Sequence, residues 1–408
     1  MTASHSRWIT CHLGAREHYA VPRALHHEHH LQLLIADAWV KPGSIWSRLP
    51  GALSRRLSER YHPDLACANV RHFTLALMAR EALWRTQRTS GWPLLMERNR
   101  WFGTRAAAAL RRVPDRAGTP TVVFAHSYSA REVFTLARSR GWTTVLGQID
   151  PGEEHFRIVE RLATEWPEFG KAPPAPPAAY FESWREECAL ATWIVVNSDW
   201  ARESLQHAGI PPAKLRVIPI PYTPEHPAEV NARDYPRVFT RDRPLRVLYV
   251  GHASVAKGVP ALLEAVAGLS DLPVALRLVG GLAMEVPSRF AQHPAITWLG
   301  PVSRSDVMQH YRDSDVLVFP SFSDGFGMAQ VEAQGWRLPI IASRSCGRVV
   351  EDGVNGIVLD EVSADALAAA LRRVIGAPNL LAEFSRRAVD DRQSSTAALS
   401  DALVALEP

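Results

Sequence analysis

The C-terminal half of the chain alternates short apolar runs with helical patterns, and this alternation restricts the fold more than any other feature of the sequence. The apolar runs lie at 245–250, 274–279, 296–299, 315–319, 339–342 and 356–359. Helical spacing of apolar residues separates them at 258–269, 305–312, 330–335 and 364–375. Strands without polar alternation are typical of a parallel sheet whose two faces are covered by helices. We therefore predict an α/β domain whose ligand binds beyond the carboxyl ends of its strands.

The N-terminal half shows the same alternation less regularly. Strands are predicted at 122–125, 145–148, 193–197 and 216–220, with helices at 129–140 and 199–208. A second domain is expected from length alone, because single cores stop growing near ~250–300 residues and this chain has 408.

Prolines concentrate at 171–177 and between Pro219 and Pro244. Proline lacks a backbone donor and interrupts helices, so both stretches are expected to be exposed connections. The second stretch divides the chain. The predicted parts are an N-terminal domain at 1–222, a linker at 223–243, a C-terminal domain at 244–376, and a helical segment at 377–408 that packs back towards the N-terminal domain.

Charge and cysteine content narrow the class of protein. The net charge of +4 does not indicate nucleic-acid binding and suits an anionic ligand or an anionic membrane surface equally well. The four cysteines form no Cys-x-x-Cys pair, which favours free thiols in a reducing compartment. The first 16 residues lack a signal-peptide core, and no apolar run reaches the ~18–20 residues of a spanning helix. We predict a cytoplasmic protein, attached at most peripherally to the inner membrane face.

Two further segments have alternative interpretations. Residues 40–62 combine arginines with Trp46 and several leucines, which suits either a patch in contact with anionic lipid or an amphipathic helix covering the N-terminal domain. The four histidines of residues 26–30 surround Glu28 at spacings that metal ligands also use. A solvated helix end explains them as well, and no metal site is predicted.

Residues 321–332, SFSDGFGMAQVE, form the segment with the most chemical information. It follows a predicted strand and opens a helix, and its two glycines permit a tight turn with close backbone approach to a ligand. Backbone amides ahead of a helix bind anions or hydroxyls. Asp324 and Glu332 can grip two ends of one polar ligand. The alternative, that both carboxylates cap or solvate the helix, stays open.

A second segment with chemical potential is GHASVAKG, from Gly251 to Gly258, which also follows a predicted strand. Lys257 is placed to meet a phosphate, and His252 can add a donor. A surface lysine in a turn is the alternative. The parallel sheet places this turn on the same edge as the loop at Gly325, which favours the phosphate interpretation.

Taken together, these segments resemble family 4 retaining glycosyltransferases of the GT-B fold. The resemblance rests on G-x5-K-G, LVGG, WLGPV, DVLVFPSFSDGFGMAQVEAQGWRLPII and EDGVNGIVL in this order, and it covers about residues 193–375. It implies two Rossmann-like domains with parallel sheets facing across a cleft. It also implies a hexosyltransferase of class EC 2.4 that moves a sugar from a nucleoside diphosphate to an acceptor hydroxyl with retention of configuration. Neither a metal nor a cofactor is implied.

The resemblance assigns roles in the C-terminal half. The family's E-x7-E signature occurs as D-x7-E, so Asp324 faces the donor sugar and Glu332 bonds the ribose hydroxyls. Lys257 matches the pyrophosphate lysine, and His252 stands where the family usually has arginine. The other expected contacts to the nucleotide-sugar donor are the amides of Gly325, Phe326 and Gly327. The backbone at Val302 is also expected to contact this donor, near its base.

In the N-terminal half the resemblance is weaker. His126 matches a strand-end histidine that bonds the donor sugar near the reacting carbon, so His126, Asp324 and Lys257 form the expected catalytic set. The segment Gly14-Ala15-Arg16-Glu17 matches a small-residue loop that faces the phosphates, with one glycine where the family has two, and Gly14 is its expected donor contact. Asp150 ends a strand and either binds the acceptor or begins a turn. Ser198 is expected to cap the helix at 199–208.

Other functions remain open at this point. A dinucleotide-dependent oxidoreductase shares parallel sheets, but no G-x-G-x-x-G follows the first strand of either half. A non-catalytic protein of the same fold that binds nucleotide sugars or a membrane surface is the main alternative. The expected partners are a nucleotide-sugar donor and an unknown hydroxyl acceptor, which is a saccharide, a lipid-linked glycan or a small molecule. Peripheral membrane contact through 40–62 is a further option, and nucleic acid is not expected.

Overall fold

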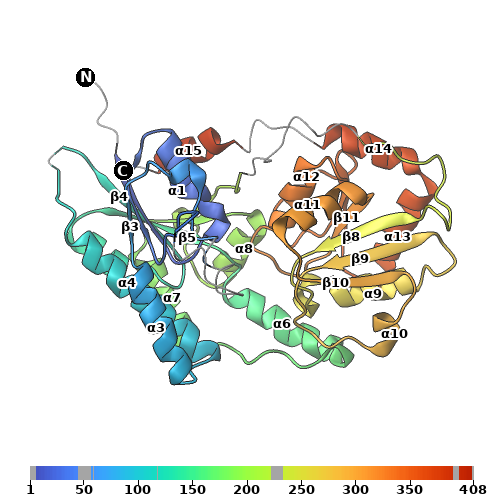
Figure 1. Ribbon diagram of the computed structural model, residues 1–408, viewed down its shortest axis with the longest axis horizontal. Coiled ribbons are helices and arrows are strands. Elements are labelled where there is room, and N and C mark those ends of the chain that lie inside the picture. Colours follow the sequence, from blue (N-terminus) through green and yellow to red (C-terminus); the bar gives the residue numbers. More distant parts are fainter. Residues whose placement is uncertain are drawn as a thin grey trace.

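The protein consists of two α/β units that lie side by side along its long axis (Figure 1). The computed structural model describes residues 6–44, 57, 59–116, 118–221, 233–388 and 395–406. One unit contains a seven-stranded sheet and the other a six-stranded sheet, and every strand pair in both is parallel. The predicted fold class, two parallel-sheet domains of the GT-B type, is confirmed.

The N-terminal sheet has the order β3-β2-β1-β4-β5-β6-β7. Its strands are β1 (Arg7–His12), β2 (Leu31–Ala36), β3 (Val70–His72), β4 (Thr121–His126), β5 (Thr143–Gln148), β6 (Trp193–Val196) and β7 (Leu215–Val217). One face packs on α4 (Gly91–Leu110), α5 (Arg131–Ser139), α7 (Ala178–Leu190) and α8 (Asp199–His207). The other face packs on α1 (Ala20–His27) and α15 (Thr396–Val404). Two further helices, α3 (Thr74–Thr86) and α6 (Glu153–Glu165), complete this unit.

The C-terminal sheet has the order β10-β9-β8-β11-β12-β13. Its strands are β8 (Leu245–Val250), β9 (Val274–Val279), β10 (Ile296–Gly300), β11 (Val316–Phe319), β12 (Ile340–Ala342) and β13 (Gly356–Val358). One face carries α9 (Val259–Ala267), α13 (Ala364–Gly376) and α14 (Pro378–Arg387). The other face carries α11 (Arg304–Asp313) and α12 (Met328–Gly335), and the short α10 (Ser288–Ala291) packs at β10. All six strands expected from the sequence are present.

The C-terminal helices are divided between the two units. Helix α14 packs on α13 through Leu381 and Phe384. Helix α15 lies against α1, and Figure 1 shows this red helix beside the blue one. The end of the chain therefore returns to the N-terminal sheet. Of the predicted linker, residues 223–232 lie outside the described part of the chain.

Both sheets reverse their strand order at an internal pair of strands. The reversal falls between β1 and β4 in the N-terminal sheet and between β8 and β11 in the C-terminal sheet. The loops after such a pair diverge and leave a crevice in which ligands bind. Four loops therefore define the expected site: those after β1, β4, β8 and β11.

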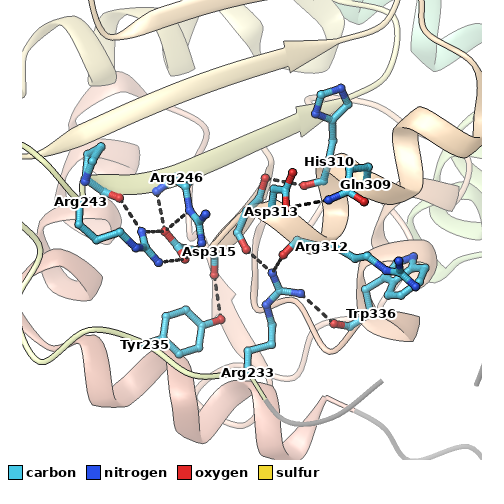
Figure 2. Close-up of polar contacts among 12 residues, drawn as sticks. Arg233, Tyr235, Arg243, Arg246, Gln309, His310, Arg312, Asp313, Asp315 and Trp336 are labelled. Carbon is cyan, nitrogen blue, oxygen red and sulfur yellow. Dashed lines mark hydrogen bonds and ion pairs between the residues drawn. The ribbon is translucent and has the colours of Figure 1, made fainter. Parts of the chain in front are cut away.

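Residues 233–243 connect to the C-terminal sheet through a cluster of charged groups (Figure 2). Asp315, immediately before β11, is almost fully buried and accepts a pair of bonds from Arg243, with Nη1–Oδ2 and Nη2–Oδ1 distances of 2.7 and 2.8 Å. The backbone and guanidinium of Arg246 add further bonds to the same carboxylate. This cluster joins the start of β8 to the start of β11.

We expect Asp315→Asn to destabilise the C-terminal domain by about 1–3 kcal/mol at pH 7, because hydrogen bonds to a charged group are lost. Burial raises the pKa of the Asp315 carboxyl, but the bonds from Arg243 and Arg246 outweigh this effect and hold the pKa below its ordinary value. A lowered folded pKa means that the stabilisation is complete above the unfolded pKa and disappears as the pH falls through the folded one. Urea unfolding at pH 7 and at pH 3 measures the difference.

The matched control is Asp360→Asn, which breaks an exposed ion pair with Arg344. Exposed pairs contribute only about 0–1 kcal/mol. Equal losses of stability for the two variants at pH 7 would show that the buried cluster stabilises the fold no more than an exposed ion pair does.

Candidate active site

A cavity of about 490 Å³ lies between the carboxyl edges of the two sheets. It is the crevice expected from the strand order, since residues that follow β1, β8 and β11 line it. The lining residues from the C-terminal domain are Tyr249, Val250, Gly251, His252, Lys257, Phe319, Asp324, Phe326, Gly327, Met328, Ala329 and Glu332. Those from the N-terminal half are Arg16, Glu17, Ile149, Asn197 and Ile220.

The loop after β11 brings backbone amides to this cavity. Gly327 has a φ of +91° and precedes Met328, the first residue of α12. A β-carbon at Gly327 would lie 2.6 Å from the Phe319 ring, so only glycine fits the turn. The first amides of a helix lack partners within the helix and carry its positive dipole end. The start of α12 is therefore suited to an anion.

Lys257 and Asp324 meet in this cavity. The Lys257 Nζ lies 2.5 Å from Asp324 Oδ2 and 3.4 Å from the Ser323 carbonyl oxygen. The other carboxylate oxygen of Asp324 accepts from the Phe326 amide at 3.3 Å. The two segments singled out in the sequence thus share one site, and the Phe326 amide is already bonded within its own loop.

Glu332 faces the same cavity from the second turn of α12. Tyr311, on α11, donates its hydroxyl to Glu332 Oε2 at 2.8 Å. Tyr311 is 1% exposed, so its position is fixed by packing. Tyr311 could not be predicted from the sequence, because a single tyrosine on an amphipathic helix carries no motif.

His252 and the glycines after β9 pack together. A β-carbon at Gly281 would lie 2.4 Å from the His252 ring, and one at Gly280 would lie 2.0 Å from the Gly251 carbonyl oxygen. The LVGG sequence is therefore required where the ends of β8 and β9 approach each other. Val302 follows β10 and is partly buried beside α11 and α12; it does not line the cavity.

The N-terminal candidates lie behind the cavity wall. His126, at the end of β4, is 1% exposed and does not line the cavity. Its ring packs against His12 with centroids 4.7 Å apart. Burial, with smaller contributions from His12 and Arg16, lowers the pKa of His126, so the imidazole is neutral. Gly14 donates its amide to Asp37 Oδ1 at 3.1 Å and is not part of the lining.

Asp150 follows β5 and is held by three donors. Its Oδ1 accepts from the Tyr128 hydroxyl at 2.7 Å, the Gln148 side chain at 2.9 Å and the Gly152 amide at 2.9 Å. The bond to Gly152 is the turn contact that the sequence analysis considered. The bond to Tyr128 connects Asp150 to a neighbouring loop.

Of the loop at 14–17, Arg16 and Glu17 line the cavity, whereas Gly14 does not. Burial lowers the pKa of Arg16 and raises that of Glu17, whose carboxylate accepts from Asn197 Nδ2 at 2.8 Å. Glu17, His18 and Tyr19 all have left-handed backbone conformations, with φ of 53°, 50° and 58°. Such conformations are costly for residues other than glycine and concentrate at functional sites. Local sequence carries no signal for them.

The loop after β11 also contacts the N-terminal domain directly. The Ser198 hydroxyl donates to the Gly325 carbonyl at 2.7 Å, and a β-carbon at Gly325 would lie 2.2 Å from the Ile149 carbonyl oxygen. His155 of α6 lies 3.1 Å from the Ser323 hydroxyl. Ser198 also accepts from the Ala201 amide, which confirms its predicted role as the cap of α8.

The remaining candidate sites do not gather ligands for a metal. Across the described residues, no group of three or more histidine, cysteine, aspartate or glutamate side chains could hold a metal ion. His26 and His27 end α1, and His27 bonds Glu28.

Residues 45–56 and 58 of the 40–62 segment lie outside the described chain, so both interpretations of this segment stay predictions. No helix in the described ranges is long and apolar enough to cross a bilayer.

Comparison with known proteins agrees with this geometry. Residues 244–377 match the family model described as "Glycosyl transferases group 1". This match covers the loops after β8 and β11, with Lys257, Asp324 and Glu332.

Two relatives with similar sequences are both named D-inositol 3-phosphate glycosyltransferase. The protein of Geodermatophilus obscurus is 28% identical over 303 residues, which are 69% of this chain and 65% of the relative. That of Xylanimonas cellulosilytica is 34% identical over 186 residues, 41% of this chain and 42% of the relative. The matched region spans less than two thirds of either relative.

Two solved structures share the fold over nearly the whole chain. Sucrose-phosphate synthase from Thermosynechococcus elongatus has a TM-score of 0.64 at 16% identity, and the match covers 98% of both chains. The Anabaena protein HepE in complex with UDP-glucose has a TM-score of 0.61 at 15% identity, again over 98% of both chains. At this identity the similarity shows the fold alone.

Proposed function

We propose that this protein transfers a sugar from a nucleoside diphosphate sugar to an acceptor hydroxyl, with retention of anomeric configuration and without a metal ion. One observation carries the proposal: Lys257, the start of α12 and Glu332 line a single cavity at the switch point of the C-terminal sheet, and the buried Tyr311 bonds Glu332 from behind. These groups suit the charged and hydroxyl-bearing parts of such a donor.

The diphosphate is assigned to Lys257 and the amides at the start of α12. A bound diphosphate competes with Asp324 for the Lys257 ammonium, because both are anions within reach of one cation. Asp324 is then released to accept hydrogen bonds from hydroxyls of the donor sugar. The ion pair thus holds both side chains in place for the donor.

The nucleoside is assigned to the other end of the cavity. The Glu332 carboxylate accepts bonds from the ribose hydroxyls, while Tyr311 fixes its orientation. The base lies towards the backbone after β10, near Val302. His252 lies between these parts, where its ring adds a donor to the phosphates.

Bond cleavage in this proposal needs no protein nucleophile. The bond between the anomeric carbon and the diphosphate oxygen breaks, and Lys257 with the helix dipole stabilises the leaving charge. The acceptor oxygen attacks from the same face, and its proton passes to the leaving phosphate. His126 is left out of this mechanism, because its side chain does not line the cavity.

The donor and acceptor classes guide the first assay. UDP and UDP-glucose are the ligands named for HepE, so uridine nucleotides come first, followed by GDP and ADP sugars. Inositol phosphate is included among the acceptors because of the names of the relatives. NAD serves as the control for an oxidoreductase.

The test combines thermal shift with release of nucleoside diphosphate, each with and without EDTA. We expect one nucleotide series to raise the Tm and its sugar to be turned over, with no loss in EDTA. Stabilisation by NAD alone overturns the proposal. Nucleotide-sugar binding without hydrolysis or transfer shows a non-catalytic binding protein, and loss of turnover in EDTA overturns the metal-independent chemistry.

The contact between Ser198 and Gly325 gives a separate prediction. Ser198→Asp keeps an oxygen that caps α8 but cannot donate to the Gly325 carbonyl. We expect the stability to fall by about 1–3 kcal/mol, because the buried carboxylate faces the Gly325 carbonyl oxygen without a donor, and turnover to fall at least ~10-fold, because the loop that holds Asp324 loses its support. Ser198→Thr, which keeps both bonds, is the matched control. Wild-type turnover in Ser198→Asp would show that the contact does not position the loop.

A further inference from the structure

A second cavity, of about 250 Å³, lies within the N-terminal domain. It is enclosed by the middle of α4, the start of α5 and the first turns of α7, on the face of the sheet away from α1. Its lining includes Asn99, Tyr128, Ala179, Tyr180 and Glu187. None of them belongs to the cavity between the domains.

Buried polar groups form part of its wall. Glu187 is fully buried and accepts hydrogen bonds from the amides of Tyr128 and Ala130 at 2.6 and 2.9 Å. Burial raises the pKa of its carboxyl to about 8. Asn99 is 6% exposed, and its Oδ1 has no hydrogen-bond partner within the described residues. Unpaired buried polar atoms are uncommon and point to a missing polar partner.

Aromatic rings form the wall nearest the cleft. Tyr128 and Tyr180 stack with their centroids 4.6 Å apart and an interplanar angle of 14°. Tyr128 has a φ of +73°, and its amide bond to Glu187 holds it there. A flat ring beside hydrogen-bonding groups suits a ligand with both C–H faces and hydroxyls, which is the surface of a sugar.

A short chain of contacts runs from this wall to the cavity between the domains. The Tyr128 hydroxyl bonds Asp150, and the neighbouring Ile149 lines the cavity between the domains. The Ile149 carbonyl is in contact with Gly325, beside Asp324. A ligand that extends past Tyr128 and Asp150 therefore approaches the proposed point of transfer.

We propose that this second cavity holds a sugar unit of the acceptor, so that the acceptor is a saccharide with its reactive hydroxyl near Asp150 and a more remote sugar beside Tyr180. This assignment rests on the proposed glycosyl transfer. It narrows the acceptor from any hydroxyl compound to a saccharide or glycoside.

The test fills the cavity without removing a contact. Ala179 is exposed at its rim, so Ala179→Trp places a ring in the cavity. Ala189→Trp is the matched control, since Ala189 is exposed on the same helix and does not line the cavity. The probes are methyl α- and β-glycosides of glucose, galactose, mannose and N-acetylglucosamine, with the corresponding disaccharides. Saturation-transfer NMR measures their binding to the full chain in the absence of donor.

We expect at least one glycoside to bind the wild type and Ala189→Trp, and to lose at least tenfold in affinity in Ala179→Trp. Equal affinity in both tryptophan variants, or no binding by any probe at 10 mM (about 3 kcal/mol of binding free energy), overturns the proposal. Nucleotide thermal shifts on the same samples check the fold. Because the glycoside measurement contains no donor, failure to turn over any nucleotide sugar is recognised separately as failure of the proposed function.

Discussion

Lys257→Ala is expected to lower turnover by about 10²–10³-fold, the usual cost of losing one preorganised group that stabilises the leaving charge. Lys257 is the cation from the C-terminal domain that reaches both the proposed diphosphate position and Asp324. Its removal also leaves the half-buried Asp324 carboxylate without its partner, so bound diphosphate meets an added negative charge. The measurement is nucleoside diphosphate release at saturating donor, with kcat and KM separated.

The control for this variant is Lys171→Ala, which removes an exposed lysine from the proline-rich connection after α6. It is expected to keep wild-type turnover. Both variants should retain the wild-type Tm within ~2 °C, because the Lys257–Asp324 pair is partly exposed and such pairs contribute little to folding. Wild-type kcat in Lys257→Ala would remove this side chain from the mechanism.

Gly258→Ala is expected to have the largest effect on stability, about 3–5 kcal/mol in the free energy of unfolding. Gly258 has a φ of +68°, and a β-carbon there would lie 1.9 Å from the Pro320 carbonyl oxygen. Neither atom belongs to a flexible side chain, so the backbone of one loop must move. Gly258 follows Lys257, and Pro320 begins the loop after β11 that carries Asp324. The backbone movement therefore also separates these two parts of the site. Urea unfolding and nucleotide thermal shift measure both effects.

Gly353→Ala is the control that distinguishes the cost of a left-handed backbone at alanine from the cost of the steric clash with Pro320. Gly353 has a similar φ of +71°, but a β-carbon there meets nothing within 4 Å. We expect a loss of only about 1–2 kcal/mol and unchanged nucleotide binding. If the two alanine variants are equally stable, the close approach to Pro320 is not a constraint on the fold.

The C-terminal sheet was predictable because its strands are buried on both faces. LRVLYV at 245–250 and VALRLV at 274–279 are largely apolar, and each is followed by glycine where the chain turns. The N-terminal strands β1, β2 and β3 were missed. RWITCH and LQLLIA carry arginine, histidine and glutamine within or beside the strand, so the apolar run is broken. Their place in the sheet depends on pairing with β4 and with each other.

The residues of the candidate site also fall into two groups, those that the sequence predicts and those that it does not. Lys257, Asp324 and Glu332 lie in local motifs at strand ends, and the parallel sheet brings them to one edge. Arg16, Glu17 and Asn197 join them from the other domain, through a left-handed turn and a side-chain bond that no local pattern signals. His126 follows its strand as expected, but its side chain points to the buried face shared with His12.

The sequence by itself determined that the chain builds two parallel sheets and that glycine-bearing turns follow β8 and β11, because strand burial and glycine turns are local properties of the residues. The tertiary structure alone decided which side chains face across the cleft, that Lys257 pairs with Asp324, and that a second polar cavity lies behind Tyr128. These depend on contacts between segments far apart in the sequence, 67 residues for Lys257 and Asp324, or on the packing of one helix against another, and such contacts leave no periodic signature in the sequence.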